Sequence, residues 1–351
     1  MRKLALLLGS LLVVASASAK EVVPAPVVVE EAPVQVIEKE VIVYRDKEVG
    51  FRPNGNVDLQ YRYYGDTEGQ NKGTWHGGDN NYSRIQLSGK INMTEKQQLQ
   101  YRIRNWNSLN EKENQMKTET RFRYFYNHGL LGDSKVNFTS RVQYRDKNSG
   151  AQDVEYMAMF NFADYMFNND YVKTTDFTVA PRYAYVWNKN TDAYDNQLGV
   201  DLYSWTDLPY GFSFEFNLYT TQHFYGQDQD FNDREADKDK NFTIDMEAYL
   251  RNTTNLYTNG NLGIDFVFEG GYDQYNWSQE KAFVNSRGKQ EDAKYSLYAW
   301  PAIQANYQAT PNVVVYVSAG AEYRNWAVEV ESEASHWRWQ PTVIAGFKTT
   351  F

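Results

Sequence analysis

Charged side chains recur at alternate positions in many segments of this chain. The basic ones fall mainly in its first half: Arg62, Arg84, Arg102, Arg104, Arg121, Arg123, Arg141 and Arg145. The acidic ones fall mainly in its second half: Asp153, Glu155, Asp201, Glu215, Asp245, Glu247, Asp265 and Glu269. A two-residue spacing puts side chains on one face of a β-strand. If the strands closed around water, the two arcs of charge would oppose each other and filter ions and polar solutes.

A few residues interrupt the two charge series. Asp58 and Glu119 are acidic exceptions in the first half, and Arg182 and Arg251 are basic exceptions in the second half. Arginine suits a basic wall because its guanidinium stays charged at any relevant pH. We interpret the pattern as a transverse field across a lumen. The alternative is that polar residues of either sign fill any wet interior.

No other pattern of reactive side chains indicates chemistry. The four histidines are scattered and none pairs with another at metal-ligand spacing: His76, His128, His223 and His336. Residues 228–233 loosely resemble a calcium loop, but Asp233 stands where the sharp turn needs glycine. We interpret this segment as a solvated acidic loop, with a loose divalent-cation site as the alternative. Because no hydrolase, zinc-protease or P-loop motif is present, we predict no catalytic residue, no metal and no cofactor.

The segments that carry these charges have the alternating pattern of long amphipathic strands. In the last segment, Trp339, Val343 and Phe347 share one face, while Gln340 and Thr342 share the other. The same alternation recurs from Asn54 onward and predicts about fourteen strands of membrane-spanning length. We therefore predict an all-β fold, a transmembrane antiparallel up-and-down β-barrel. A soluble sandwich would also alternate, but its strands are usually only about 5–6 residues long.

The connections support a barrel. Short turns alternate with long polar loops, as in outer-membrane barrels. The third long-side loop, Asp146–Gln152, is short, so any constriction would come from another loop. The candidates are Gly65–Tyr82, Gln227–Lys240 and Gln274–Asp292.

The chain divides into three parts. Residues 1–19 are predicted to be a signal peptide, because a basic start and an apolar run precede Ala17-Ser18-Ala19. Residues 20–52 are rich in Pro, Val and Glu and are predicted to be a periplasmic arm. Residues 53–351 are predicted to be the transmembrane barrel.

Composition agrees with a membrane barrel. The chain has 28 Tyr, 19 Phe and 9 Trp, which would supply aromatic girdles at the membrane interfaces. Its mean hydropathy of −0.70 is compatible with a barrel because only the lipid-facing half of each strand must be apolar. The absence of cysteine excludes a disulfide scaffold. A net charge of −9 argues against a nucleic-acid partner.

The last three strands have an inward face that is less polar than a lumen wall should be. Its expected members are Tyr298, Trp300, Val314, Tyr316 and Ile344. Three explanations stay open: this side is narrow, the arm or a loop packs there, or the strand register is misassigned.

Several blocks spread over the whole chain resemble the fusobacterial major outer-membrane porin family. They are Val43-Tyr44-Arg45-Asp46, Arg52-Pro53-Asn54-Gly55, Phe162-Ala163-Asp164-Tyr165, Glu269-Gly270-Gly271-Tyr272-Asp273 and Trp337-Arg338-Trp339-Gln340-Pro341-Thr342. The resemblance implies a 14-stranded, trimeric channel in outer-membrane lipid, giving non-specific passage to small hydrophilic solutes. It also implies surface loops that bind host or bacterial ligands.

Two other functions compete with passive diffusion. A sugar-selective channel would use an aromatic track, with these candidates: Tyr64, Tyr203, Tyr219, Tyr249, Tyr298 and Trp300. A surface adhesin would use the barrel only to display its loops, and this role can coexist with a channel.

The C-terminus generates a prediction about assembly. The resemblance implies that the barrel insertion machinery reads Phe351 together with Phe347, although Thr349 stands where such signals usually carry an apolar residue. We expect deletion of Phe351 to lower the yield of membrane-inserted trimer, measured on unheated gels, with little change in ion selectivity. A normal trimer yield would contradict the assignment.

Overall fold

The computed structural model describes residues 50–68, 81–109, 117–147, 149–231, 238–284, 289–325 and 337–351. It divides into two units, one with Met1–Phe51 and Phe351 and one with Arg52–Thr350. The predicted signal peptide and nearly all of the predicted arm lie outside the described residues, as do His76 and His336. The fold below is that of Arg52–Thr350.

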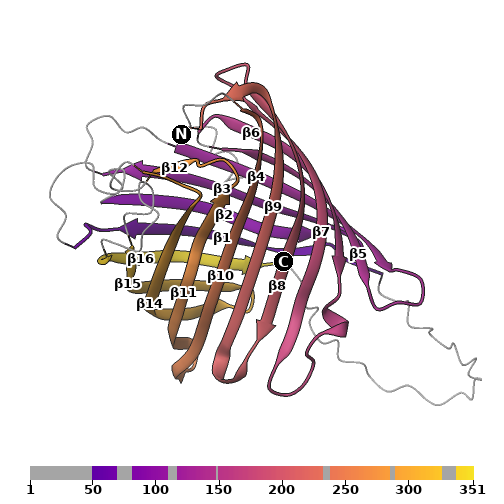
Figure 1. Ribbon diagram of the computed structural model, residues 1–351. Helices are drawn as coiled ribbons and strands as arrows, with labels where there is room; N and C mark the ends of the chain where they lie inside the picture. The colour runs from indigo at the N-terminus through magenta and orange to yellow at the C-terminus, as the bar shows by residue number, and fades with distance from the viewer. Residues whose placement is uncertain are drawn as a thin grey trace, which may run out of the picture. The chain divides into compact units, whose positions relative to one another are not determined.

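In the part of the chain that the structure describes, fourteen strands form a closed antiparallel barrel (Figure 1). The first seven are β1 (Asn54–Tyr64), β2 (Tyr82–Asn92), β3 (Gln97–Ser108), β4 (Lys117–Leu130), β5 (Asn137–Asp146), β6 (Ala151–Asn161) and β7 (Lys173–Asn188). The others are β8 (Tyr194–Asp207), β9 (Phe212–Gln229), β10 (Lys238–Asn259), β11 (Leu262–Ser278), β14 (Ala293–Thr310), β15 (Val313–Asn325) and β16 (Trp337–Thr350). Each strand pairs with its neighbour in sequence, which confirms the predicted up-and-down barrel.

The barrel closes where its last strand meets its first. β16 pairs antiparallel with β1, and the register sets Leu59 opposite Phe347 and Tyr61 opposite Ala345. These four side chains lie on the outer face, as the alternation predicts. The indigo and yellow strands therefore lie side by side in Figure 1.

The connections differ in part from the sequence-based expectation. The sequence pattern predicts a link at Asn252–Asn259, but in the structure these residues continue β10, and the chain turns at Gly260 to enter β11. β11 runs on to Ser278, and the following loop contains a small hairpin, β12 (Phe283–Val284) with β13 (Gln290–Glu291). The third long-side loop is short as predicted, because β5 ends at Asp146 and β6 begins at Ala151. Two single-turn 3₁₀ helices, η2 (Ala163–Tyr165) and η3 (Pro209–Gly211), lie in other connections.

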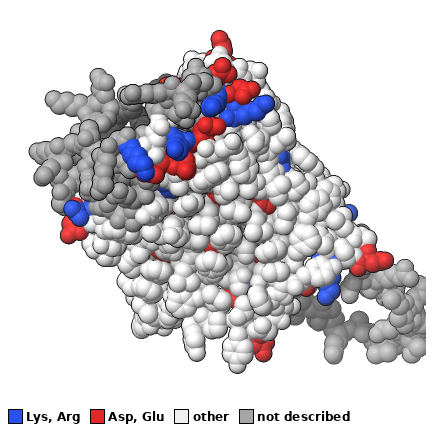
Figure 2. All heavy atoms as spheres, in the orientation of Figure 1, with Lys and Arg blue, Asp and Glu red and all other residues white. Residues whose placement is uncertain are grey.

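The wall has two chemically different faces. Val317 points outward and is 50% exposed, whereas the next residue, Ser318, points inward and is 1% exposed. Large apolar side chains stand exposed around the barrel, among them Ile85, Phe122, Val142, Val154, Tyr156, Val200, Ile303 and Val343. Figure 2 shows this face as a broad uncharged band with most Lys, Arg, Asp and Glu gathered near its ends. Among the described residues, no helix is long and apolar enough to cross a membrane.

The inward face of β14–β16 is filled by its own aromatic side chains. Trp300 donates its indole N–H to Thr342 Oγ1 at 2.7 Å, and the guanidinium of Arg62 lies over the Trp300 ring. The Tyr316 hydroxyl donates to Asp58 at 2.8 Å. The inward position at Gly346 is small, so the Tyr316 ring can lie across it. Of the three explanations left open by the sequence, the described contacts favour a narrow, self-packed side.

Gly346 generates a prediction about this packed side. A methyl group there would lie 2.6 Å from the Tyr316 ring and 2.7 Å from the carbonyl oxygen of Leu59 on β1. We expect Gly346→Ala to lower the free energy of unfolding by about 1–3 kcal/mol, because overpacking forces side chains and backbone apart. Urea unfolding of protein folded into lipid vesicles measures this change.

Gly263→Ala is the matched control for that experiment. It lies on β11, and its nearest neighbour atom would be Asn255 Nδ2 at 3.9 Å, an ordinary contact. Equal stability of the two variants would contradict the packing argument at Gly346.

Candidate functional site: the charged lumen

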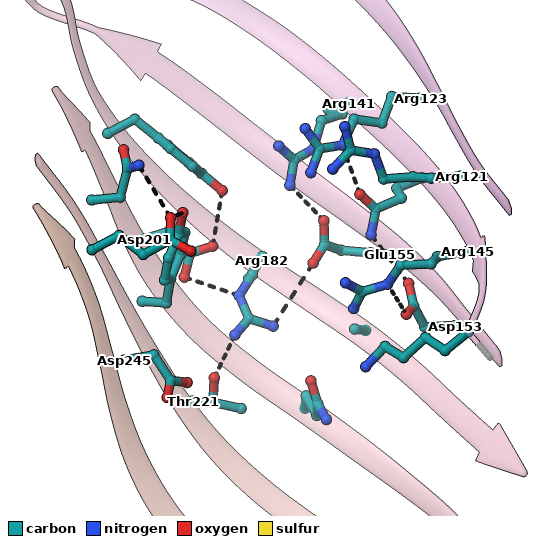
Figure 3. A pocket seen from close by; sticks show the side chains of 18 of the residues that line it. Arg121, Arg123, Arg141, Arg145, Asp153, Glu155, Arg182, Asp201, Thr221 and Asp245 are labelled. Carbon is teal, nitrogen blue, oxygen red and sulfur yellow. Dashed lines mark hydrogen bonds and ion pairs between the residues drawn. The ribbon is translucent and has the colours of Figure 1, made fainter. Parts of the chain in front are cut away.

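The lumen contains a central cavity of about 930 Å³ whose walls carry most of the predicted charges. The basic residues predicted from the sequence that line it are Arg102, Arg104, Arg121, Arg123, Arg141 and Arg145. The acidic residues predicted from the sequence that line it are Asp153, Glu155, Asp201, Glu215, Asp245, Glu247 and Glu269. They come from neighbouring strands β3 to β11, so closure of the barrel brings together residues from distant parts of the sequence (Figure 3).

Three of the predicted residues do not line this cavity. Arg62 forms an ion pair with Glu322 at 3.7 Å on the packed side of the lumen. Arg84 donates to the Gln60 side-chain oxygen at 3.4 Å. Asp265 accepts from Asn306 at 2.6 Å, on the β11–β14 part of the wall.

Five arginines form what we call the arginine cluster: Arg102, Arg104, Arg121, Arg123 and Arg145. The strand register sets Arg121 of β4 directly opposite Arg102 of β3 and also directly opposite Arg145 of β5. Three like charges therefore share one row across adjacent strands. Like charges directly opposite each other destabilise a sheet, so this row costs folding free energy.

Neutral amides fix two members of the cluster. The Nε–H group of Arg104 donates to Gln86 Oε1 at 2.7 Å, and that of Arg123 donates to Gln143 Oε1 at 2.7 Å. Amide oxygens orient the guanidinium groups without neutralising them. The cluster consequently keeps its positive charge.

Ion pairs join the basic and acidic walls where they meet. Arg141 contacts Glu155 at 2.6 Å, and Arg145 contacts Asp153 at 2.8 Å. Arg182 of β7 bonds Asp201 at 3.0 Å and also donates to Thr221. Figure 3 shows Arg182 reaching toward both Asp201 and Glu155. The two charge arcs thus touch side by side at β5–β8, in addition to facing each other elsewhere.

The acidic wall is supported by tyrosines. The Tyr219 hydroxyl donates to Glu247 at 2.9 Å, and the Tyr249 hydroxyl bonds the Asp273 carboxylate at 3.2 Å. Tyr298 donates to Glu269. These hydroxyls hold the carboxylates in place along β10 and β11.

The same tyrosines bear on the sugar-track alternative. Tyr203, Tyr219, Tyr249 and Tyr298 line the cavity, whereas Tyr64 and Trp300 do not. The Arg251 guanidinium lies 4.8 Å from the centre of the Tyr249 ring, and that of Arg324 lies 4.7 Å from the centre of Tyr298. Those ring faces are occupied by cations and cannot stack on a sugar.

Sequence reasoning did not assign Arg324 or Glu322 to the lumen. Arg324 bonds Asp273 and Ser296, each at 2.7 Å, and also Glu322. Both residues continue the inward alternation of Tyr316 and Ser318 on β15. The two-residue period that places Tyr316 on the inward face also places Glu322 and Arg324 there.

The two histidines that the structure describes, His128 and His223, have hydrogen-bond partners of their own. His223 bonds Asp195 at 2.7 Å through Nδ1 and Thr243 at 3.2 Å through Nε2. A catalytic Asp–His pair would need a nearby N–H group that is free to bind an oxyanion. The Thr243 backbone pairs with strands on both sides, so its N–H is not free. We therefore assign no catalytic role to Asp195, His223 and Thr243. His128 contacts Ser140 on the outer face. No three His, Asp or Glu residues of the described ranges could hold a metal; Asp233 lies outside those ranges.

Comparisons with known proteins add little to this geometry. No protein-family model and no curated protein matches the sequence. A bacterial polysaccharide outer membrane secretin is similar at 9% identity, with 85% of this chain and 98% of that chain covered and a TM-score of 0.39. The Salmonella typhi OmpF complex with daunomycin is similar at 12% identity, with coverages of 86% and 98% and a TM-score of 0.37. Similarities at this level do not transfer a function, so the function is inferred from the barrel itself.

Arg324 generates a prediction about the buried charges. Its side chain is 14% exposed and that of Glu322 is 9% exposed. We expect Arg324→Met to lower the free energy of unfolding by about 3 kcal/mol, because Glu322 and Asp273 lose the guanidinium that bonds them and buried Glu322 keeps only its 3.7 Å contact with Arg62. Adding Glu322→Gln should restore part of that loss, measured by urea unfolding in lipid vesicles.

Lys189→Met is the control for Arg324→Met. Lys189 pairs with Asp146 at 3.2 Å, but its side chain is 47% exposed. An exposed pair contributes only about 0–1 kcal/mol. Comparable losses in the two variants would show that burial does not set the cost.

Proposed function

We propose that the protein is a porin of the bacterial outer membrane, a water-filled channel for passive diffusion of small hydrophilic solutes and ions. One observation carries the proposal: a single closed wall is apolar and exposed outside, and charged inside. Water on the outside would leave a continuous apolar band unburied. Lipid outside and water inside satisfy both faces, and a closed barrel leaves no strand edge in the lipid.

The charges of the lumen support diffusion of polar solutes. The arginine cluster lies on β3–β5, and Asp245 and Glu247, which form no ion pair within the described part of the chain, lie on β10. A field across the cavity orders water and favours solutes that carry charge or a dipole. Apolar solutes cannot replace that water.

The remaining assignments extend this proposal. Export by the signal peptide in residues 1–19, a periplasmic arm in residues 20–52, a homotrimeric state and membership of the fusobacterial porin family are parts of it. Contact with the insertion machinery through Phe347 and Phe351 and adhesion through surface loops also belong to it. The supporting features are the sequence blocks and the exposed outer face.

Planar-bilayer recording of the purified full-length protein tests the proposal. A trimeric diffusion channel gives large conductance steps in groups of three that added sugars do not block. Steps blocked by sugar in proportion to its concentration would indicate a selective channel instead. Absence of conductance would favour a display scaffold and refute the channel.

Ion selectivity tests the role of the basic wall. We expect the combined substitution of Arg102, Arg104, Arg121 and Arg123 by Gln to raise the cation-to-anion permeability ratio by roughly threefold or more, because the carboxylates then dominate the field. Reversal potentials in a salt gradient measure the ratio. Lys90→Gln, a single charge loss on the inward face of β2 outside the cavity, is the control and should have little effect. An unchanged reversal potential in the quadruple variant would contradict the transverse field.

A further inference from the structure

We propose that the arginine cluster is a binding site for small oxyanions that carry two or more negative charges. The inference rests on the proposed channel function and deepens it, because it names a solute class that the lumen would retain. It is carried by the number of charges in the cluster, by its free hydrogen-bond donors and by its arrangement across three strands.

The cluster holds more cations than its neighbouring carboxylates can neutralise. Glu119 contacts Arg102 at 2.6 Å, and Asp153 contacts Arg145 at 2.8 Å. Lys147 lines the same cavity beside Arg145 and adds another cation. Among the described residues, no carboxylate forms an ion pair with Arg104, Arg121 or Arg123. The excess charge therefore has to be balanced from solution.

Several guanidinium nitrogens lack acceptors within the described part of the chain. Arg104 and Arg123 each use Nε for a glutamine, which leaves both terminal nitrogens of each group without a hydrogen bond there. Arg121, between Arg102 and Arg145, has no hydrogen-bond acceptor among the described residues. The Nε atom of Arg102 is buried and also lacks a partner in these residues. Unmet donors of a charged group are costly, and a bound acceptor would remove that cost.

The arrangement fits an anion with several oxygen atoms. Arg102, Arg121 and Arg145 lie in one row on adjacent strands, and strands are spaced about 4.8 Å apart. Arg123 lies two residues further along β4, on the same face as Arg121. Figure 3 shows Arg121 and Arg123 next to each other on the cavity wall. Guanidinium forks bind carboxylate or phosphate oxygens in pairs, so one oxyanion can bridge two or three of these arginines.

Valence and shape separate this ligand from ordinary counterions. Chloride has one charge and no directional acceptors, so it gains little from the fork geometry. A divalent or higher oxyanion neutralises more of the cluster and accepts several charge-assisted hydrogen bonds. Phosphate esters and polycarboxylates share this chemistry, and inorganic pyrophosphate and citrate are probes that represent the two sources.

Channel block measures binding in the protein as it functions. Current through single channels in potassium chloride is recorded in planar bilayers while pyrophosphate or citrate is added. We expect each probe to reduce the current in a saturable way. Potassium chloride added to the same ionic strength should not reduce the current. The probe with the lower half-blocking concentration shows whether the site binds phosphate esters or polycarboxylates more tightly. A current that neither probe reduces would overturn the inference and leave the channel function standing, whereas absence of any conductance would refute both.

Two variants separate a binding site from a general field. Arg121→Gln with Arg123→Gln should raise the half-blocking concentration roughly tenfold or more, whereas Lys90→Gln should leave it unchanged. Arg121→Lys keeps the charge but removes the fork, so we expect weaker block at an unchanged reversal potential. Block of wild-type strength in Arg121→Lys would overturn the site in favour of the field alone. Formation of open channels by each variant in potassium chloride, whatever the size of the conductance steps, shows that it has folded.

Discussion

Closure of the hydrogen-bonded wall between β1 and β16 is the constraint on which the rest of the structure depends. An open strand edge leaves a row of backbone N–H and C=O groups without partners, and lipid offers none. Pairing of Asn56–Tyr64 with Thr342–Thr350 removes that edge. Once the sheet is closed, each strand has one face inside and one outside. The alternation of polar and apolar residues along every strand then has only one orientation that suits lipid.

The same closure concentrates charge. Residues that would be solvated separately on an open sheet line one cavity of about 930 Å³. Where oppositely charged strands adjoin, as at Arg141 and Glu155, the charges pair. Where like-charged strands adjoin, as at β3–β5, pairing within the described residues is incomplete. Stability and binding are therefore opposed in the arginine cluster, since like charges that weaken the sheet attract an anion.

The two sides of the lumen differ in how tightly their side chains are packed. On β14–β16, Trp300 and Tyr316 cover small inward residues and make hydrogen bonds across neighbouring strands. This side is packed like a protein core with a few buried ion pairs, such as Arg62 with Glu322. On β3–β11 the side chains reach into an open cavity. The packed side supports the barrel, and we infer that the open side contacts solutes.

The sequence by itself determined the strands, their inward and outward faces, the closing role of the last strand and most residues of the cavity. These features follow from a two-residue period, which is local and can be read from alternate positions such as Arg121 and Arg123. A local period determines strand ends less well. The C-terminal part of β10, Asn252–Asn259, has the sequence pattern of a link, and β15 continues past Tyr323 to Asn325. The signal peptide and the arm stay predictions, since nearly all of their residues lie outside the described ranges.

Only the tertiary structure decided which inward residues meet. The pairing of Tyr316 with Asp58 joins positions 258 apart in sequence, and the row of Arg102, Arg121 and Arg145 depends on the register of two strand pairs. A shift by two residues would keep every face unchanged and yet separate these side chains. Periodicity therefore fixes the side of the wall on which a residue lies, while inter-strand register and barrel closure fix its neighbours.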